Sequence, residues 1–197
     1  MQSEALKERQ QSSYGPGSSL LTTGGEEPKD GYLEATQIYY LLTPDSIRGR
    51  MHMNLHSVSS IAFLLTFVQT FHVHHAGRAL YTLIKPPSSP QTLPDIRRII
   101  MGSNIATGEV TQLFVPGGWW KASELPEEDL LLLTAPGAEP GLNERIGCLI
   151  SEVVVPGWTI EQHQFIDEDK VRKHRTETQD RQSHGLMRLA SSYVEWP

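Results

Sequence analysis

The sequence predicts an all-β protein, a sandwich or barrel built from short strands. Seven runs of β-prone residues recur after Tyr32, separated by turn signals: QIYYLLT, FHVHH, ALYTLI, RRIIMG, TQLFV, DLLLLTA and ISEVVV. The segments between them, such as KPPSSPQTLPD and PGAEPG, are rich in the proline and glycine that tight turns need. No long helical pattern interrupts this order, so the fold class that we expect is all-β.

The length predicts one domain with a tail at each end. The 197 residues are about the size of one ordinary domain. Residues 1–31 are rich in Ser, Gln, Gly and Glu, so we expect a disordered N-terminal tail before a domain over residues 32–167. Residues 168–197 are predicted to be a charged, disordered C-terminal tail. The alternative is that LMRLASSYVEWP forms a short helix that docks on the barrel or on a second subunit.

Charge and hydropathy argue against several kinds of partner. The net charge is −6 and no basic stripe is interleaved with aromatic residues, so we expect no nucleic-acid binding. The longest apolar stretch, residues 61–71, is shorter than the roughly 18 residues of a membrane span, so we expect no membrane insertion. Cys148 is the single cysteine, and the first residues lack the apolar run of a secretory signal. We therefore expect a cytoplasmic protein.

A cluster of histidines is the strongest local anomaly in the chain. Five of the eight histidines fall between positions 52 and 75. Side chains alternate along a strand, so His72 and His74 are expected on one face and His75 on the other. Two imidazoles on one face can bind a metal or exchange a proton. The alternative is that they only fill a polar patch.

The segment VPGGWWKASEL is the second anomaly. A tight Pro-Gly-Gly turn places Trp119 and Trp120 directly before Lys121. Two aromatic side chains beside a lysine can wall a pocket, and a partly desolvated lysine can act as an acid or base with a lowered pKa. The alternative is that the tryptophans are core residues and the lysine extends its ammonium group to solvent.

Four segments together resemble one branch of the cupin superfamily. They are IYYLLTPDSIRGRMHMN, FHVHHAGRALYTLI, VPGGWWKASEL and CLISEVVVPGWTIEQHQFI, and they cover roughly residues 32–167 in the right order. This branch is of unknown function and has fungal and yeast members similar to plant storage proteins and nucleotide-sugar epimerases. The resemblance implies a double-stranded β-helix, the RmlC-like cupin or jelly-roll barrel, that is often dimeric and has a ligand pocket inside.

The resemblance also implies a metal motif that this chain does not keep. Cupins that bind a metal carry two histidines in an HxH step, then a Glu seven residues before a closing Gly. If Gly77 is that glycine, the Glu position falls on Thr70, and the HxH step is best matched by His52 and Asn54.

The second cupin motif, PxGxxH, also departs from the pattern. It is matched by Pro116 and Gly118, but Lys121 replaces the histidine ligand. Only one of four usual ligand positions keeps its ligand, and an ammonium beside a divalent cation is electrostatically costly. We therefore expect no metal and no other cofactor, although a site rebuilt from His52, His72 and His74 remains an alternative.

Residues 58–69, VSSIAFLLTFVQ, interrupt the first cupin motif. Removing them would join LHS directly to TFHVHHAG, so we interpret them as an insertion or as an artefact of gene prediction. Such an insertion within a barrel strand would have to shift the register or bulge out of the sheet, and a misfolded, inactive chain is one possible outcome.

The sequence predicts a cupin that binds a small metabolite and performs metal-independent proton transfer: an isomerase, epimerase, dehydratase or cyclase of fungal specialised metabolism. The alternatives are a non-catalytic, storage-like binding protein and a metal-dependent oxygenase, the latter disfavoured by Thr70 and Lys121. We also expect that the chain can form a homodimer. The predicted catalytic residues are His72, His74, Lys121 and His52, and the predicted ligand-binding residues are Asn54, Thr70, Tyr81, Trp119 and Trp120.

Overall fold

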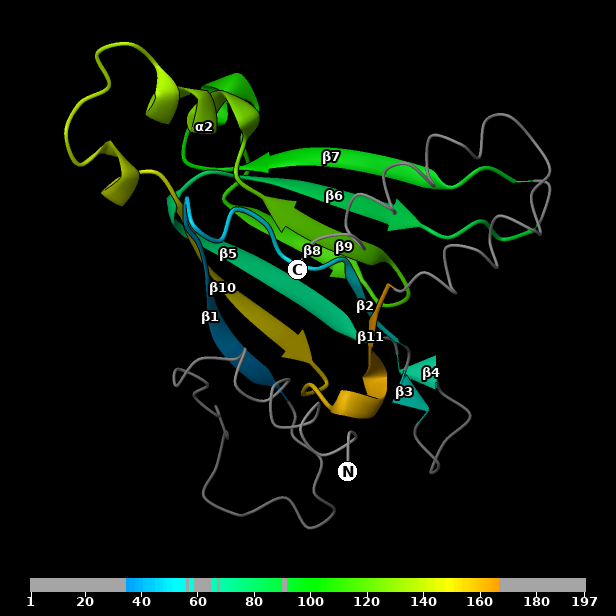
Figure 1. Cartoon of the computed structure of the whole chain (residues 1–197). Helices are drawn as coiled ribbons and strands as arrows, with labels where there is room; N and C mark the ends of the chain where they lie inside the picture. The colour runs from blue at the N-terminus through cyan, green and yellow to red at the C-terminus, as the bar shows by residue number, and fades with distance from the viewer. Residues whose placement is uncertain (1–34, 56, 59–64, 67, 90–91, 167–197) are drawn as a thin grey trace, which may run out of the picture.

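The computed structural model describes residues 35–55, 57–58, 65–66, 68–89 and 92–166, which are coloured in Figure 1. The predicted tails, residues 1–31 and 168–197, lie outside the described residues. The described chain forms two antiparallel sheets with few helices (Figure 1). This arrangement confirms the predicted all-β jelly-roll fold.

The first sheet has the strand order β1-β10-β5-β8. The bounds of its strands are β1 (Thr36–Leu42), β5 (Gln69–Gly77), β8 (Gln112–Pro116) and β10 (Cys148–Val155). Pairing of β1 with β10 runs from Thr36 opposite Val154 to Leu42 opposite Cys148. This sheet therefore joins the beginning of the described chain to a strand near its end.

The second sheet has the strand order β11-β2-β9-β6-β7. Its strands are β2 (His52–Asn54), β6 (Ala79–Lys85), β7 (Asp95–Met101), β9 (Trp120–Glu124) and β11 (His163–Phe165). After β7 the chain alternates between the sheets, because β8 and β10 belong to the first sheet while β9 and β11 belong to the second. Residues far apart in sequence thus meet across the interior.

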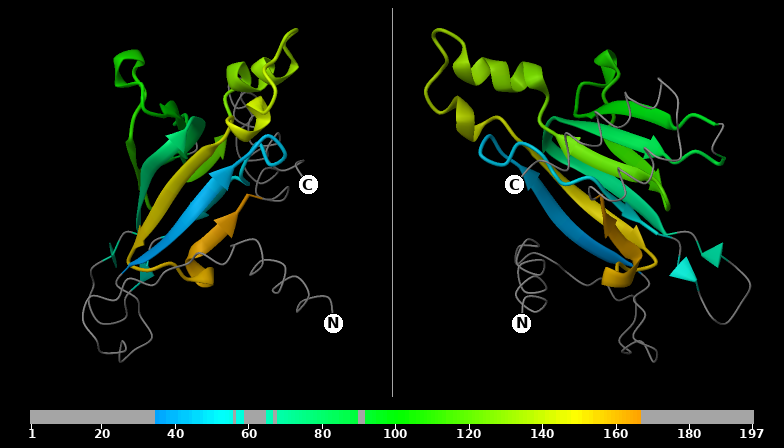
Figure 2. Two further views of the ribbon diagram at one scale, coloured as in Figure 1. Left: turned by 90° about the vertical axis from the view of Figure 1, so that its left-hand side faces the viewer. Right: turned by 45° about the vertical axis from the view of Figure 1, so that its right-hand side comes forward.

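The two sheets face each other, as both views in Figure 2 show. Apolar side chains from both sheets form one core between them, because side chains on alternate positions of each strand point inward. Its buried members include Leu42, Tyr81, Leu83, Met101, Leu113, Val115 and Ile150.

A second apolar cluster belongs to the second sheet. Its buried members are Met51, Met53, Ile84, Trp120 and Ala122. Trp120 is the cross-strand partner of Ile84, whereas its neighbour Lys121 is the partner of the core residue Leu83. Since neighbours on a strand point to opposite faces, this cluster lies on the face of the sheet that is turned away from the interior.

The predicted strand DLLLLTA is instead a helix, α2 (Glu127–Thr134). Pro126 precedes it and three acidic residues occupy its first turn, where they interact favourably with the positive end of the helix dipole. Leucine is a strong helix former, so the run of leucines supports the helix. Leu131 and Leu132 are exposed, which a buried strand would not allow. The short 3₁₀ helices are η1 (Ile105–Thr107), η2 (Leu142–Glu144) and η3 (Ile160–Gln162).

The described ends of the segment 58–69 pair with each other. Strands β3 (Ser57–Val58) and β4 (Leu65–Thr66) form a separate antiparallel ladder. Val68 is 1 % exposed and β5 begins directly after it, with Thr70 paired to Val115 and Val154. The described ends of the segment therefore pair with each other apart from the two main sheets, and β5 keeps its pairing with β8 and β10. Residues 59–64 and 67 lie outside the described residues.

None of the helices in the described part of the chain is long and apolar enough to cross a membrane.

Candidate functional site

Four strands direct polar side chains into a cluster between the sheets. The residues are His72 on β5, Tyr81 on β6, Lys121 on β9 and Glu152 on β10. His72, Tyr81 and Lys121 are each 2 % exposed, and the Glu152 side chain is 12 % exposed. Glu152 is the cross-strand partner of His72, so the first sheet holds these two side by side while the second sheet supplies the other two.

Lys121 is the charged centre of this cluster. Its Nζ forms an ion pair with Glu152 Oε1 and lies 3.2 Å from His72 Nε2. A buried ammonium is costly unless its charge is paired and its hydrogen bonds are satisfied. Here the charge is paired with Glu152 and two of the three N–H donors have partners, and the ion pair connects the two sheets.

The ammonium of Lys121 also fixes the tautomer of His72. An ammonium only donates, so His72 Nε2 must accept from it and the ring proton must lie on Nδ1. Nδ1 lies 3.1 Å from the hydroxyl of Tyr81, which therefore accepts that proton's hydrogen bond. Tyr81 in turn is hydrogen-bonded to Ser123, which is also hydrogen-bonded to Tyr40. A hydrogen-bonded chain thus leads from Lys121 across the interior to Tyr40.

The charges of the cluster follow from its burial and its pairing. Burial lowers the pKa of His72 to about 3, and the positive charge of Lys121 adds to this effect. Burial also lowers the pKa of Lys121, although Glu152 opposes that shift. Burial alone would raise the pKa of Glu152, but Lys121, together with His72 and His52, outweighs it and holds that pKa well below its usual range. At neutral pH the cluster therefore holds one ion pair and a neutral His72.

A second set of polar residues lies beside the first. Asn54 Nδ2 donates to Thr70 Oγ1 at 3.0 Å, and His163 Nδ1 donates to Asn54 Oδ1, also at 3.0 Å. His52 Nδ1 donates to the carbonyl of Arg50 at 2.9 Å, and its ring centre lies 4.8 Å from that of His163. This set is contiguous with the first, because His52 is the cross-strand partner of Lys121.

Six residues predicted from the sequence are brought together by the fold. His72 contacts both Lys121 and Tyr81, Asn54 and Thr70 are hydrogen-bonded, and His52 pairs with Lys121 across β2 and β9. The parity argument for β5 holds for Thr70 and His72, both of which are 2 % exposed.

His74 does not join His72, contrary to the expectation. The pairing of β5 with β10 shifts between Leu149 and Ile150, where an irregularity skips His75. His74 itself still pairs with Ile150 on the regular part of the ladder, but its side chain is only partly buried and its Nε2 bonds the carbonyl of Gly77 at 2.7 Å. His74 is therefore tied to the turn at the end of β5.

The two tryptophans do not wall the polar cluster together. Trp120 belongs to the apolar cluster on the opposite face of the sheet from Lys121, so its predicted ligand-binding role does not fit the geometry. Trp119 packs against the core and has the guanidinium of Arg97 4.8 Å above its ring and Lys85 Nζ at 6.0 Å. Trp119 thus lies beside two cations supplied by β6 and β7.

Sequence reasoning missed Glu152, Ser123 and His163. Glu152 is the one charged residue in the run ISEVVV, and a carboxylate within an otherwise apolar run is a signal of a paired, buried charge. His163 lies in a strand of three residues, which is too short for a periodicity argument.

The donor set of the cluster does not fit a metal ion. A divalent cation would need the lone pairs of His72 Nε2 and Glu152, and the Lys121 ammonium already engages both. Among the described residues, no group of three or more His, Cys, Asp or Glu side chains is arranged to hold a metal.

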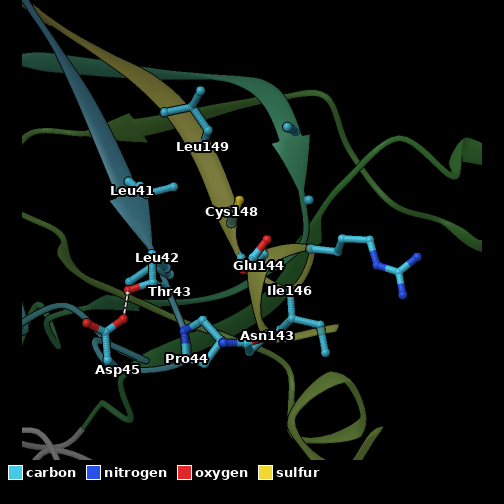
Figure 3. A pocket seen from close by; sticks show the side chains of 14 residues that line it. Leu41, Leu42, Thr43, Pro44, Asp45, Asn143, Glu144, Ile146, Cys148 and Leu149 are labelled. Atoms are coloured by element: carbon cyan, nitrogen blue, oxygen red, sulfur yellow. Dashed lines mark hydrogen bonds between the residues drawn. The ribbon is translucent and has the colours of Figure 1, made fainter. Parts of the chain in front are cut away.

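A surface groove of about 440 Å³ lies apart from this cluster (Figure 3). It is lined by residues 41–45, 76–77 and 143–149, where the ends of β1 and β5 meet the start of β10. Thr43 Oγ1 donates to Asp45 at 2.6 Å at its rim. Burial raises the pKa of the Cys148 thiol to about 12, so the cysteine in this groove is not a nucleophile. The titratable side chains Asp45, Glu144 and Arg145 that line the groove are exposed, whereas the polar cluster between the sheets is buried, so the cluster is the better candidate site.

Comparison with known proteins agrees with this architecture. A sequence model of the cupin superfamily (DUF985) matches residues 18–166. The uncharacterized protein YML079W of Saccharomyces cerevisiae is 34 % identical over 142 residues, which are 72 % of this chain. The match covers 55 % of the yeast protein, so this chain spans about half the length of that relative.

Two solved structures share the fold at low sequence identity. A hypothetical protein from Leishmania major is 20 % identical with a TM-score of 0.53, and the match covers 87 % of this chain and 90 % of that one. A protein from Shewanella oneidensis is 14 % identical with a TM-score of 0.56, covering 92 % and 88 %. The interleaved sheets, the interior polar cluster and the match over most of the sequence lead to one conclusion: this chain belongs to the cupin superfamily, in the family DUF985.

Proposed function

We propose that this cupin binds a small carbonyl compound between its sheets and catalyses metal-independent proton transfer, as an isomerase, epimerase, dehydratase or cyclase. The observation that carries the proposal is the buried Lys121 ammonium, held between Glu152 and His72, with Tyr81 behind the imidazole. A cation, a neutral base and a hydroxyl within one water-poor site are the groups that enolisation requires.

Lys121 would stabilise the developing negative charge. An ammonium has three N–H groups, so one can stay on Glu152 while another turns from His72 Nε2 to the substrate's carbonyl oxygen. As the C–H bond next to the carbonyl breaks, its electron pair forms the enolate, and the negative charge collects on the oxygen beside the ammonium. No oxidant or metal takes part in this step.

His72 would receive the proton on Nε2, which Lys121 frees when it turns to the substrate. The charge of Lys121 is one reason why the pKa of His72 is low, after burial itself. The enolate offsets that charge as it forms, so His72 becomes more basic as the proton moves. Tyr81 holds Nδ1–H throughout and keeps the ring in place. Return of the proton from His72 to a neighbouring carbon gives the isomer, and its return to the opposite face, after the enolate has turned over in the site, gives the epimer.

Deuterium exchange tests this proposal without knowledge of the natural substrate. The protein is incubated in D₂O with a panel of small 2-keto acids, ketoses and aldoses, and NMR follows loss of the proton next to each carbonyl. We expect catalysed exchange that disappears in Lys121→Met and His72→Phe but survives in Lys85→Met, whose lysine is exposed. Binding without exchange would favour the storage-like alternative, and unchanged exchange in Lys121→Met would contradict the proposal.

The place of this activity in fungal specialised metabolism, in the cytoplasm, is part of the same proposal. Its support is the family resemblance and the relative from a fungus, Saccharomyces cerevisiae. Co-expression of the gene with a biosynthetic cluster, and fractionation of the cells that express it, test the two statements.

We also propose a homodimer through the outer face of the first sheet. Five large apolar side chains are exposed on alternate positions of its strands: Tyr39 (59 %), Leu41 (56 %), Phe71 (40 %), Phe114 (46 %) and Val155 (37 %). The rings of Phe71 and Phe114 pack 5.2 Å apart across β5 and β8. Apolar patches larger than a few hundred Å² are rare on monomers, and a two-fold axis would pack this face on itself. Light scattering on the purified protein measures the mass directly.

A further inference from the structure

His163 has a buried nitrogen that no described group satisfies. Its Nδ1 donates to Asn54 Oδ1, and the Asn54 amide is itself oriented by its bond from Nδ2 to Thr70. The ring proton therefore lies on Nδ1, and Nε2 carries a lone pair. Nε2 is buried and has no hydrogen-bond partner among the described residues. A buried acceptor without a donor costs free energy, so this atom is suited to accept a hydrogen bond from a ligand.

His52 presents a second lone pair next to it. Its Nδ1–H donates to the carbonyl of Arg50, which leaves Nε2 as an acceptor. The two imidazole rings lie 4.8 Å apart at an interplanar angle of 35°. Phe165 and Trp158 pack edge-on against His163 at 4.6 Å and 5.7 Å between ring centres, and these contacts hold its ring in position. The result is a pair of oriented acceptors beside Lys121.

The charge of the surroundings decides what these acceptors can bind. Burial, followed by the charge of Lys121, lowers the pKa of His52 to about 3 and that of His163 to about 4. Both rings are therefore neutral at physiological pH. Lys121 and Glu152 offset each other, and Arg50, the other cation whose charge reaches His163, is exposed to solvent that screens it, so the buried interior holds no excess positive charge for an anion. Neutral acceptors recognise groups that donate, and hydroxyl groups are the neutral donors that small metabolites carry.

We propose that His163 and His52 form a recognition arm that accepts hydrogen bonds from neighbouring hydroxyl groups of a neutral, polyhydroxylated, sugar-like ligand. The inference rests on the proposed function and names its substrate class: the arm would hold the hydroxyl groups while the carbonyl faces Lys121. An anionic ligand, such as a sugar acid or a phosphate ester bound through its charge, does not fit this arm.

The test begins with the free protein labelled with ¹⁵N in its histidines. Long-range ¹H–¹⁵N spectra distinguish a protonated ring nitrogen from one with a lone pair, and assignment uses the single substitutions His163→Phe and His52→Phe. We expect Nε2 of both residues to be unprotonated at pH 7. A proton on Nε2 of His163 would overturn the proposal before any ligand is added, and the spectrum that decides this is that of the wild-type protein, since the variants serve only for assignment.

The same spectra then follow a titration with D-xylose and D-galactose, and separately with D-galacturonate and inorganic phosphate. We expect the neutral sugars at millimolar concentration to shift Nε2 of His163 and His52, while His75 on the outer face stays unchanged. His163→Phe should weaken sugar binding about five- to tenfold, because it keeps a ring but removes the acceptor. His163→Gln supplies a new acceptor and should recover part of the affinity, whereas the control His75→Gln should bind like the wild type.

Failure of this inference can be told apart from failure of the proposed function. Sugars that shift His72 but leave His163 unchanged would overturn the recognition arm and leave the acid–base site standing. Binding of galacturonate or phosphate alone, or no shift of any imidazole with any probe, would overturn the sugar-like class. Deuterium exchange that is lost in Lys121→Met would still support proton transfer in both cases.

Discussion

Lys121 and Glu152 form an ion pair that joins the two sheets inside the barrel. Lys121 comes from β9 of the second sheet and Glu152 from β10 of the first. Removal of one partner of a buried pair leaves an uncompensated charge, whereas replacement of both can be nearly neutral. Substitutions of Lys121 and Glu152 therefore measure how much this pair contributes to the free energy of unfolding, without knowledge of any substrate.

Glu152→Gln should strongly destabilise the fold. The ammonium of Lys121, which is 2 % exposed, would lose its counter-charge, and we expect the free energy of unfolding to fall by about 3 kcal/mol. Urea denaturation followed by fluorescence measures the change. Glu139→Gln, which breaks an exposed pair with Arg145, is the control and should cost less than about 0.5 kcal/mol. Adding Lys121→Met to Glu152→Gln should recover most of the loss; no recovery would mean that the charge pair is not the cause.

Stability should fall as the pH falls below about 6.5. His72 and His52 have pKa values lowered to about 3, against an ordinary value of 6.5, so between these values the unfolded chain binds protons that the folded chain does not. Stability therefore rises with pH across this window, by up to about 1.4 kcal/mol per pH unit for each histidine. The pKa of Glu152 is also lowered, so the fold loses further stability as the pH falls below 4.5, the ordinary pKa of a glutamate side chain.

The measurement is the free energy of unfolding at pH values from 4 to 8. His72→Phe should reduce the slope of the free energy of unfolding against pH, between pH 6.5 and 4.5, by the amount that corresponds to about one bound proton. A flat profile over this window in the wild type would contradict the assignment of neutral, buried imidazoles.

Gly49 should be required for the hydrogen bond between Ser123 and Tyr40, at the end of the hydrogen-bonded chain that begins at Lys121. A Cβ at this position would lie 2.3 Å from the Tyr40 hydroxyl oxygen and 3.5 Å from Ser123 Oγ. Gly49→Ala would push the hydroxyl away from Ser123, and we expect a loss of about 1–2 kcal/mol of stability. The hydrogen bond from Ser123 lowers the pKa of Tyr40, which burial raises to about 12, so loss of this bond should raise the pKa further, as ultraviolet titration would show.

The partner variant for Gly49→Ala is Tyr40→Phe, which removes the hydroxyl that the new methyl group would meet. In that background Gly49→Ala should cost little, because the nearest remaining ring atom is 3.3 Å from the Cβ. Equal costs of Gly49→Ala in both backgrounds would show that the contact with the hydroxyl does not limit this position.

Much of this site can be predicted from the sequence, because strand alternation is a local property. The alternation of side chains along β5 predicts that Thr70 and His72 share the inner face. The Pro-Gly-Gly turn and the two tryptophans before Lys121 predict a partly desolvated lysine. His74 is not explained by the same argument, because its ring bonds the carbonyl of Gly77 at the end of β5, beside a register shift that skips His75 and is set by tertiary pairing. Glu152 and His163 could not be connected to Lys121, since their proximity arises only when β10 and β11 join different sheets.

Phe71→Glu should convert the proposed dimer to a monomer. Phe71 lies in the apolar outer face of the first sheet and is 40 % exposed, so a charge there is tolerated in the monomer but would be buried without a partner in a dimer. Light scattering at micromolar concentration gives the mass of each protein. Leu131→Glu on α2, at a side chain that is 60 % exposed, should leave the dimer intact. A wild type that is monomeric, or a Phe71→Glu variant that is still dimeric, would rule out this interface.

Lys121→His should create a metal site that the wild type lacks. The ammonium now engages both His72 Nε2 and Glu152, and it repels any divalent cation between them. An imidazole in its place would release these two donors and add a third, the minimum that Zn²⁺ needs from a protein in an open site. Isothermal titration with Zn²⁺ after removal of metals should show stoichiometric binding by Lys121→His, with loss of that binding when His72→Phe is added. Equally tight binding by the wild type would show that Lys121 does not exclude metals, and the case for acid–base chemistry at this cluster would then lose its electrostatic basis.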